Sequence, residues 1–321
     1  MDLKFHTTDE NMLKEVYDVI ILGAGPAGLT AGIYTGRALL KTLIIEEGVI
    51  GGEAASTELI ENYPGFSEGI SGMKLTDSMR QQAERFGVKI IMTYTKEVIL
   101  TGDRKVVKTD DGLFSAKAII IATGSFPKAL NIPGEKEFKG KGVSYCATCD
   151  APFFKDRDIA VIGAGSSGVQ ESLYLLKFAK SIKLVEFLPN MTAEKILQER
   201  IKKYKNVEFF LNHRLKSING KQMVENITVE DRETGTDKVL PVVGVFIYVG
   251  LRPNTEIFMG ALKVDKNGFI ITDEDLRTSK SGVFAAGDVR EKTLRQVATA
   301  VGDGAVAAFS AKEYIGKQES H

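Results

Sequence analysis

The sequence of 321 residues has little cysteine and histidine and no tryptophan: it contains two cysteines, three histidines and eight prolines. His6, His213 and His321 stand far apart, so they show no paired spacing of the kind that a four-ligand zinc site requires. We therefore predict that the chain holds no metal ion. Two cysteines also exclude a small scaffold built on disulfides, and a chain of this length is enough to bury the cores of about two domains.

The chain also lacks an excess of either charge and any long apolar run. Lys and Arg together number 42, as do Asp and Glu, so no global field favours nucleic acid. No stretch approaches the ~20 uninterrupted apolar residues of a membrane span. Residues 1–20 mix charges with isolated apolar residues and contain no signal-peptide core. These absences predict a globular protein of the cytoplasm.

Both cysteines fall in one short segment, S-Y-C-A-T-C-D at 144–150, in which two residues separate Cys146 from Cys149 and Asp150 follows. In a reducing compartment a permanent structural disulfide is not expected. A two-residue spacer also closes too small a ring to restrain much of the chain. Metal binding, redox chemistry and coincidence are the interpretations that remain, and the scattered histidines count against the first.

Two stretches of the chain, 17–47 and 157–187, match at a constant offset of 140 residues. Each has an apolar strand, then G-x-G-x-x-G, an apolar pattern of helical period, and a second apolar strand closed by a glutamate. The first glycine of such a motif makes a tight turn, the second lets the backbone approach a pyrophosphate, and the third lets the helix pack close to the strand. Two copies predict two βαβ units that each bind a dinucleotide.

The flanking segments indicate which ligand each unit takes. The first unit is followed by a Gly-rich polar loop at 51–66, and later by A-T-G at 122–124 and A-A-G-D at 285–288, each at the end of a predicted strand. An acid at such a strand end can accept hydrogen bonds from the ribityl hydroxyls of a flavin. We therefore expect a prosthetic flavin in the first unit and a nicotinamide nucleotide in the second.

The order of these motifs predicts a discontinuous first domain. If A-A-G-D serves the ligand of the first unit, 1–127 and 254–321 form the flavin domain, and 128–253 form an inserted nucleotide domain. The chain then crosses between the domains twice, which suits a hinge. Alternation of apolar and polar residues between turn signals predicts antiparallel strands over 97–121 in the first domain and over 232–250 in the second.

Together these motifs resemble the low-molecular-weight thioredoxin reductases over essentially the whole chain beyond the first dozen residues. The match comprises G-A-G-P-A-G, the loop G-G-E-A-A-S-T-E-L-I-E-N-Y-P-G, A-T-G, C-A-T-C-D, the second G-x-G-x-x-G and A-A-G-D-V. C-A-T-C-D is the most specific element, because the larger disulfide reductases carry their cysteines near the N-terminus. The resemblance implies an α/β fold of two Rossmann-like, three-layer ββα domains, the second inserted in the first, in a homodimeric FAD enzyme.

The resemblance also implies roles for the residues of C-A-T-C-D. Electrons pass from the flavin to the dithiol, and from there to the disulfide of thioredoxin or a similar small protein. Cys149 resembles the cysteine that lies against the flavin, Cys146 the one that attacks the partner's disulfide, and Asp150 the acid that protonates the leaving dithiol. Thiol–disulfide exchange through a mixed disulfide suits this spacing, and an adjacent carboxyl can carry the proton. A rotation of the inserted domain between the two steps is implied as well.

A set of FAD-binding residues follows from the resemblance. They belong to the first glycine motif and its closing acids, the Gly-rich loop, A-T-G, A-A-G-D, and an R-Q-V stretch similar to the family's R-Q-A segment beside the isoalloxazine. They are Gly23, Ala24, Gly25, Pro26, Ala27, Gly28, Glu46, Glu47, Gly51, Gly52, Glu53, Asn62, Ala122, Thr123, Gly124, Gly287, Asp288, Arg295, Gln296 and Val297.

The second unit departs from the family where the electron donor is recognised. Relatives that use NADPH carry H-R-R-x-x-x-R after the second strand, whereas 186–192 reads E-F-L-P-N-M-T here. Glu186 places a carboxylate where the 2′-phosphate would sit, and like charges in contact repel strongly when poorly solvated. The sequence therefore favours NADH over NADPH, with Gly163, Gly165, Gly168 and Glu186 as nucleotide ligands, and another electron donor stays open.

Two other functions stay open as well. One is a related flavoprotein that feeds electrons to a peroxidase or glutaredoxin-like partner, although such proteins often carry an extra N-terminal thioredoxin-like module. The other is a flavin-binding redox sensor whose second domain has lost its nucleotide, an interpretation that the bulky Phe187 and Leu188 keep open. A ferredoxin or flavodoxin reductase of this fold is disfavoured, because it lacks the C-x-x-C.

Overall fold

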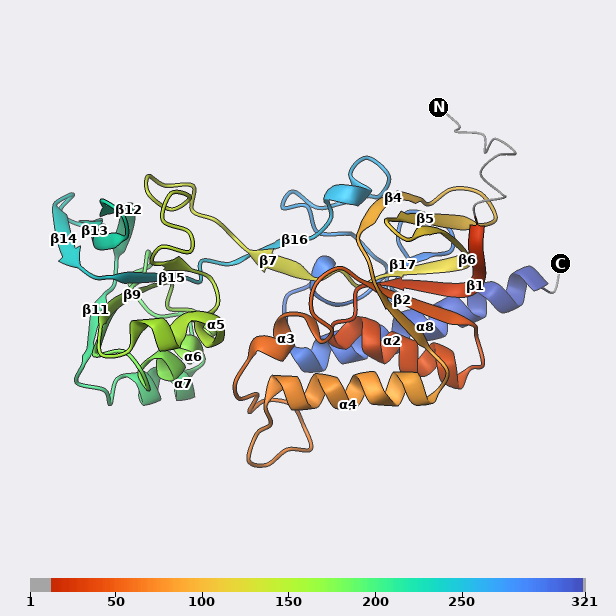
Figure 1. Cartoon of the computed structure of the whole chain (residues 1–321), viewed down its shortest axis with the longest axis horizontal. Helices are drawn as coiled ribbons and strands as arrows, with labels where there is room; N and C mark the ends of the chain where they lie inside the picture. Colours follow the sequence, from red (N-terminus) through yellow and green to blue (C-terminus); the bar gives the residue numbers. More distant parts are fainter. Residues whose placement is uncertain (1–12, 320–321) are drawn as a thin grey trace. The chain divides into compact units, whose positions relative to one another are not determined.

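The computed structural model describes residues 13–319, and the chain divides into two compact units (Figure 1). The first unit comprises the described parts of Met1–Phe126 and Arg252–His321, and the second is Pro127–Leu251. The second unit is thus inserted in the first, and the division falls within two residues of the predicted borders. Which nucleotide each unit binds is a separate question that the division does not answer.

Two sequence-based expectations concern the ends of the chain. Residues 1–12, which include His6 and most of the segment inspected for a signal peptide, lie outside the described residues, as does His321. Among the helices within 13–319, none has the length and apolar character needed to cross a membrane.

The first unit is built on one sheet with strand order β3-β2-β1-β6-β5-β4, in which β17 also pairs with β6. Five of its strands are parallel to one another. They are β1 (Leu13–Leu22), β2 (Thr42–Glu46), β3 (Lys89–Met92), β6 (Gly112–Ile121) and β17 (Val283–Ala285). The strands β4 (Thr95–Ile99) and β5 (Lys105–Thr109) continue the sheet in antiparallel fashion.

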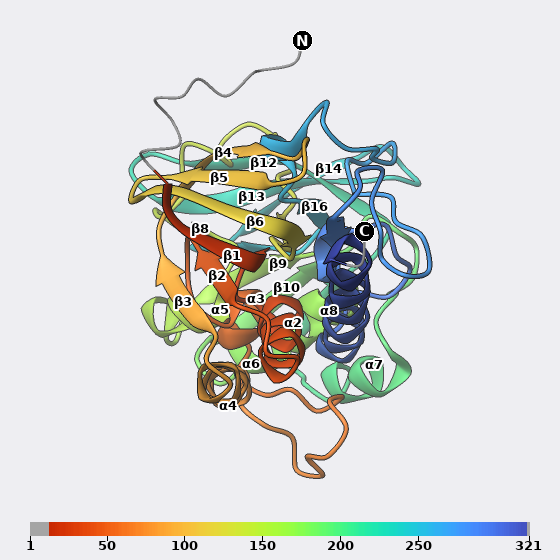
Figure 2. The ribbon, with the colours of Figure 1, turned by 90° about the vertical axis from the view of Figure 1, so that its right-hand side faces the viewer.

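Successive residues of the parallel strands enter two different cores. Val19 and Ile21 of β1 join the core under the helices, whereas Ile20 and Leu22 join the core on the opposite face. Figure 2 shows the helices on one side of β1 and β6, with β4 and β5 on the other. The helices on this side are α2 (Pro26–Arg37), α4 (Gly72–Arg85) and α8 (Val297–Glu319), while α3 (Gly52–Ser56) lies in the loop after β2.

The helix α8 is longer than the closing amphipathic helix that the sequence predicts over 302–315. It runs from Val297 to Glu319, so Gly302 and Gly304 lie inside the helix. Gly304 is needed there for packing, because a Cβ atom at this position would lie 2.3 Å from the carbonyl oxygen of Ala27 on α2. The glycine therefore brings α8 against the helix that follows the first glycine motif.

The second unit repeats this plan on a smaller scale. Its parallel sheet has the order β11-β10-β9-β15-β8, with α5 and α6 on the core of one face and the antiparallel sheet β12-β13-β14 on the other. The parallel strands are β8 (Val143–Ser144), β9 (Asp158–Ile162), β10 (Ser181–Val185), β11 (Val207–Phe210) and β15 (Gly244–Ile247). The other elements are α5 (Ala147–Asp150), η1 (Ala151–Phe154), α6 (Ser166–Leu175), α7 (Lys195–Ile201), β12 (His213–Gly220), β13 (Val224–Asp231) and β14 (Asp237–Pro241).

The α/β class is confirmed, but two strands were assigned to the wrong kind of ladder. The segment 232–250 contains antiparallel β14, whereas β15 is a central strand that is parallel to β9 and β8. All four residues of β15 are buried, which is typical of a parallel strand covered on both faces. Likewise β6 is antiparallel only to β5 and is parallel to β1 and β17.

The two chain crossings pair with each other. The strands β7 (Ser125–Pro127) and β16 (Leu251–Pro253) form a two-stranded ribbon. The backbone N–H of Asn254 donates to the Gly124 carbonyl at 3.0 Å, and that of Lys128 to the Gly250 carbonyl at 2.9 Å. Both crossings are thus fixed to one another by backbone hydrogen bonds on each side of the ribbon.

Candidate active site and nucleotide sites

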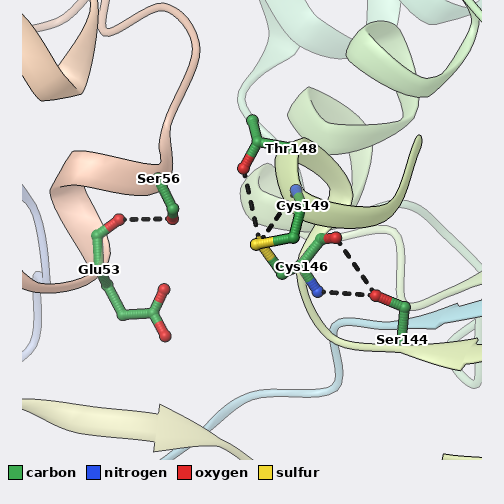
Figure 3. The surroundings of a disulfide bond; sticks show 6 residues. All are labelled: Glu53, Ser56, Ser144, Cys146, Thr148 and Cys149. Carbon is green, nitrogen blue, oxygen red and sulfur yellow. Dashed lines mark hydrogen bonds between the residues drawn. A yellow bond between two sulfur atoms is a disulfide. The ribbon is translucent and has the colours of Figure 1, made fainter. Parts of the chain in front are cut away.

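The two cysteines form a disulfide at the start of α5. Their sulfur atoms are 2.07 Å apart and their Cα atoms 5.4 Å apart (Figure 3). The Ser144 hydroxyl accepts a hydrogen bond from the Cys146 N–H at 3.0 Å and donates one to the Cys146 carbonyl at 3.2 Å. Cys149 is exposed, whereas Cys146 is half-buried. The predicted dithiol pair is therefore brought together, at a position that a buried serine helps to hold.

Asp150, the third predicted catalytic residue, closes α5. Its backbone N–H donates to the Cys146 carbonyl at 3.3 Å, which keeps the acid one turn from the first cysteine. Within residues 13–319, no hydrogen bond or ion pair engages the Asp150 carboxyl. The half-buried Asp150 carboxyl is therefore not committed to a structural contact within its own unit.

The first glycine motif separates glycines required by the fold from one that faces open space. A Cβ atom at Gly23 would lie 2.3 Å from the carbonyl oxygen of Ala122, and one at Gly28 would lie 1.9 Å from that of Gly23. At Gly25 a Cβ atom would meet nothing within 4 Å. Gly25 is the N-cap of α2, and Pro26 stands at the first helical position, where its missing N–H costs nothing. The open side of Gly25 suits a pyrophosphate, as this motif requires.

The acids after β2 have different tasks. Glu46 accepts hydrogen bonds from the Ala24 N–H at 2.6 Å and the Gly48 N–H at 2.7 Å, so its carboxylate lies directly beside the glycine motif. Glu47 instead accepts from the Thr95 N–H at 2.9 Å and thereby holds the start of β4. Glu46 is thus held beside the glycine motif, and Glu47 has a structural contact of its own.

The Gly-rich loop meets the R-Q-V stretch from the other end of the sequence. The Asn62 side-chain amide donates to the Gln296 side-chain oxygen at 3.1 Å, across 234 residues of sequence. Gly51 and Gly52 both have positive φ angles, and the Gly51 N–H donates to the Ala24 carbonyl at 2.8 Å. The loop is thus attached to the glycine motif at one end and to Gln296 at the other. Glu53 lies in the first turn of α3.

The A-T-G segment joins the glycine motif to the second crossing. Ala122 donates its N–H to the Leu22 carbonyl at 2.7 Å, beside the turn at Gly23. The Thr123 hydroxyl donates to the Asn254 carbonyl at 2.8 Å, so this predicted ligand is used to hold the chain where it returns. Gly124 has a φ of +67°.

The A-A-G-D segment presents an unsatisfied acceptor. One carboxyl oxygen of Asp288 is buried and has no hydrogen-bond partner among the described residues. Burial raises the pKa of this carboxyl, while the charges of Lys292 and Arg295 act in the opposite direction and Asp303 adds to the rise. Arg295 has its guanidinium 3.9 Å from the centre of the Phe269 ring and a buried Nε without a partner. An orphaned acceptor and an orphaned donor in one unit indicate a polar ligand.

A charged cluster beside the turn at Gly287 and Asp288 was not predicted from the sequence. Asp303 of α8 accepts from the Gly287 N–H at 3.0 Å and the Lys292 ammonium at 2.7 Å, and Arg290 lies 3.5 Å from the same oxygen. Gly287 has a φ of +79°, so the turn before Asp288 needs both glycine and this hydrogen bond. The sequence signal is weak, because Asp303 lies within the predicted closing helix 302–315 and no local pattern marks it as a partner of Gly287. These residues, with the open Gly25 and the orphaned Asp288 oxygen, fit FAD.

The second glycine motif reproduces the first. A Cβ atom at Gly168 would lie 2.0 Å from the Gly163 carbonyl oxygen, whereas at Gly165 the nearest atom would be the Thr192 hydroxyl at 3.6 Å. Glu186 is buried and accepts from the Ala164 N–H at 2.6 Å and the Leu188 N–H at 2.9 Å. Glu186 therefore has the same attachment as Glu46 in the first copy.

The residue after Glu186 is covered by an arginine that sequence reasoning did not consider. The Arg232 guanidinium lies 3.7 Å from the centre of the Phe187 ring and donates to the Phe187 carbonyl at 2.8 Å and to the Asn212 side chain at 3.1 Å. Arg232 follows β13 and is 45 residues away in sequence. Only the tertiary fold brings it to the segment that would face the adenosine.

Two dinucleotide-type units, one inserted in the other and carrying a C-x-x-C disulfide, define a nucleotide-dependent disulfide oxidoreductase. Residues 17–304 match the family described as pyridine nucleotide-disulphide oxidoreductase. The thioredoxin reductase of Listeria innocua is 45% identical over 303 residues, which cover 94% of this chain and 95% of that protein. The chain therefore belongs to the low-molecular-weight thioredoxin reductases.

Solved structures agree with this family. The thioredoxin reductase of Lactococcus lactis has a TM-score of 0.92 and 42% identity, with 94% of this chain and 99% of that chain covered. A more distant structure, named a ferredoxin-flavin thioredoxin reductase of Clostridium acetobutylicum, has a TM-score of 0.51 and 26% identity over 95% of this chain and 99% of that one. The second name indicates that relatives of this fold can differ in their electron donor.

Proposed function

We propose that the protein reduces the disulfide of thioredoxin or a similar small protein, using electrons from NADH that pass through FAD and the pair Cys146 and Cys149. The observation that carries this proposal is the disulfide at the start of α5, beside an acid whose carboxyl is not engaged within its unit. Such a pair takes up two electrons and two protons when its sulfur–sulfur bond breaks.

The FAD site is supported by residues of the first unit. Gly25 would leave room for the pyrophosphate at the N-terminus of α2, Glu46 would hold the ribose hydroxyls, and the orphaned Asp288 oxygen would hold the ribityl chain. The hydrogen bond from Asn62 to Gln296 attaches the Gly-rich loop to the segment just before α8. When bound, FAD supplies a two-electron carrier between the nicotinamide and the disulfide.

The dithiol acts by thiol–disulfide exchange. The Cys146 thiolate attacks one sulfur of the partner's disulfide, so that a mixed disulfide forms and the partner's other sulfur leaves as a thiolate. The Cys149 thiolate then attacks Cys146, restores the internal disulfide and releases the partner's second thiolate. The partner gains two electrons and, from solvent, two protons, and the pair loses the same two electrons. Asp150 handles a proton of the dithiol when the pair is reduced again.

NADH is the donor that the second unit supports best. Glu186 is held by the same two kinds of backbone hydrogen bond as Glu46, so it presents its carboxylate to a ribose in the same way. Each carboxylate oxygen has a second lone pair for a ribose hydroxyl. A 2′-phosphate would meet this carboxylate instead. Phe187 and Leu188 follow where relatives that use NADPH have arginines.

A spectral titration tests the proposal. Under anaerobic conditions NADH should bleach the flavin absorbance at far lower concentration than NADPH, and oxidised thioredoxin should restore it. Arg232 is the cation that contacts Phe187, in the segment after Glu186, so Arg232→Leu serves as the comparison variant. If NADPH proves to be the better donor, this change should weaken the binding of NADPH and not that of NADH. Bleaching by neither nucleotide would refute the nicotinamide part and favour a protein donor or a sensor.

A second experiment isolates the dithiol. Cys146→Ser should abolish reduction of thioredoxin while NADH still reduces the flavin, and Cys149→Ser should trap thioredoxin as a stable mixed disulfide with Cys146. Unchanged turnover in either variant would refute the assigned exchange. If peroxidase or glutaredoxin-like proteins, and not thioredoxin, reoxidise the enzyme, the alternative of a flavoprotein that feeds such partners is correct.

We also propose that the enzyme is a homodimer of the cytoplasm, through the first unit. The helices α2 and α8 pack together and each exposes large apolar side chains, namely Tyr34 at 48%, Val306 at 41% and Phe309 at 59%. Val306 and Phe309 are three residues apart and so share one face of α8. Phe309→Glu should convert the dimer to a monomer in light scattering, with Lys317→Glu in the last turn of the same helix as a charge control. A monomeric wild type would refute this part.

A further inference from the structure

The two sulfur atoms of the disulfide have unequal surroundings. The Sγ atom of Cys146 receives the Cys149 backbone N–H at 3.3 Å and lies 3.5 Å from the Thr148 hydroxyl (Figure 3). In the described part of the chain, no polar group is within hydrogen-bond reach of Cys149 Sγ. Thr148, which lies between the two cysteines, thus directs its hydroxyl to the Cys146 sulfur and not to the Cys149 sulfur.

We propose that Thr148 is a catalytic residue, whose hydroxyl stabilises the Cys146 thiolate in the reduced enzyme and thereby makes Cys146, and not Cys149, the attacking cysteine. This inference rests on the proposed function, since the exchange reaction requires one thiolate to attack first. The attacking species is the thiolate, so a group that binds the anion raises the fraction of reactive Cys146 at neutral pH.

The chemistry favours the contact more strongly after reduction. A disulfide sulfur is a weak acceptor, whereas a thiolate carries a full charge, and hydrogen bonds to ionised groups are stronger than neutral ones. The Thr148 hydroxyl rotates freely and can donate its proton to that charge. The Cys149 N–H is already directed to the same atom, and Ser144 holds the Cys146 backbone on both sides. Of the two groups that contact Cys146 Sγ, only the Thr148 hydroxyl can be removed by a substitution that leaves the backbone unchanged.

Charged groups on α5 and on the elements beside it must be separated from this effect. Asp150 lies on α5 itself, Glu171 on the packed helix α6, and Lys155 follows η1. On the strand side, Tyr145 donates its hydroxyl to the buried Glu135 at 2.7 Å. None of these groups changes when Thr148 is replaced by valine or serine. The two substitutions therefore isolate the hydroxyl.

The test uses the full-length protein in a Cys149→Ser background, in which Cys146 is the single cysteine of the chain. Thiolate absorbance near 240 nm, followed against pH, gives the pKa of Cys146. We expect a value below the ~8.5 of a free cysteine. Thr148→Val, which keeps the shape and loses the hydroxyl, should raise this pKa by about 0.5 to 1 and slow alkylation by iodoacetamide at pH 7 about three- to five-fold. Thr148→Ser should stay within about 0.2 of the parent.

A second measurement keeps the proposal open to refutation if the valine variant folds poorly, which far-UV circular dichroism would reveal. In the reduced protein with both cysteines, limiting iodoacetamide should label Cys146 before Cys149, as peptide mass spectrometry reads directly. A pKa that is the same with valine as with threonine, a serine variant that behaves like valine, or prior labelling of Cys149 would each overturn the role of Thr148. None of these readouts depends on thioredoxin or on the electron donor, so failure here is distinguishable from failure of the proposed function.

Discussion

Alanine at Gly25 and at Gly28 should have opposite effects, although the two glycines belong to one motif. At Gly28 a Cβ atom would lie 1.9 Å from the Gly23 carbonyl oxygen, whereas at Gly25 it would meet no atom within 4 Å. The fold therefore needs a glycine at Gly28 for its own packing. It needs one at Gly25 only if a ligand approaches the backbone there. The pair separates stability from FAD binding.

The magnitudes follow from these contacts. A Cβ atom normally keeps more than 3 Å from backbone oxygen, so Gly28→Ala must move α2 by about 1 Å against buried strands, and overpacking of this kind costs about 3 kcal/mol. Gly25 has φ −74° and ψ −176°, which alanine adopts without strain. There the gain of about 0.4–1 kcal/mol from a stiffer unfolded chain is offset by the poorer N-cap that alanine makes. Stability should change by less than about 0.5 kcal/mol.

Urea unfolding of the cofactor-free protein gives the first quantity, and quenching of flavin fluorescence gives FAD affinity. Gly28→Ala should lower the unfolding midpoint. Gly25→Ala should leave the midpoint unchanged and weaken FAD about 100-fold, which corresponds to about 2.7 kcal/mol. FAD that binds Gly25→Ala as tightly as wild type would show that the pyrophosphate lies elsewhere.

Three further substitutions test buried or paired carboxyls. Glu135 is buried and accepts from the Leu130 N–H and the Tyr145 hydroxyl, so Glu135→Ala should cost about 3 kcal/mol in urea unfolding, and Glu135→Gln less. Burial raises the pKa of Asp288, so the ionised carboxylate destabilises the fold at pH values above its ordinary pKa. Asp288→Asn should therefore raise the Tm of the cofactor-free protein at pH 7 but not at pH 3. The same change should weaken FAD binding. Hydrogen bonds from Lys41 and Tyr17 lower the pKa of Glu15 from 4.5 to about 2. At neutral pH Glu15→Gln should cost less than about 1 kcal/mol, because the group is exposed. This difference in stability between the variant and the wild type should vanish as the pH falls from 4.5 to 2. An unchanged difference at pH 2 would contradict the last.

Sequence predicted the features that local chemistry determines. The repeat could be found because each copy needs the same glycines: Gly23 and Gly163 must approach the carbonyls of the next strand, and no other residue fits. The insertion followed from the order of motifs alone. The spacing of the cysteine pair left metal binding, redox chemistry and coincidence open, and the family resemblance indicated the redox pair; in the fold the two sulfur atoms lie within bonding distance.

Features that depend on contacts distant in sequence could not be predicted. The contact of Asn62 with Gln296 and the pairing of Asp303 with the Gly287 N–H join segments whose own patterns carry no sign of a partner. The strand β15 was misassigned for a related reason, because burial on both faces depends on neighbours that the local alternation does not reveal. Thr123 and Glu47 have the residue types of ligands, yet each holds a neighbouring strand or crossing.

The structure also changes how Glu186 must be understood. As a sequence feature it is a specificity residue, and replacement by arginine would be the obvious way to introduce NADPH. In the fold its two carboxylate oxygens satisfy the buried N–H groups of Ala164 and Leu188, which an arginine cannot accept from. An exchange at this position would therefore disturb the glycine turn before it altered the nucleotide. Leu188, which is exposed and contributes only its backbone N–H to Glu186, is the better position for a new cation. Cofactor choice in this unit is tied to the hydrogen bonds that build its nucleotide loop.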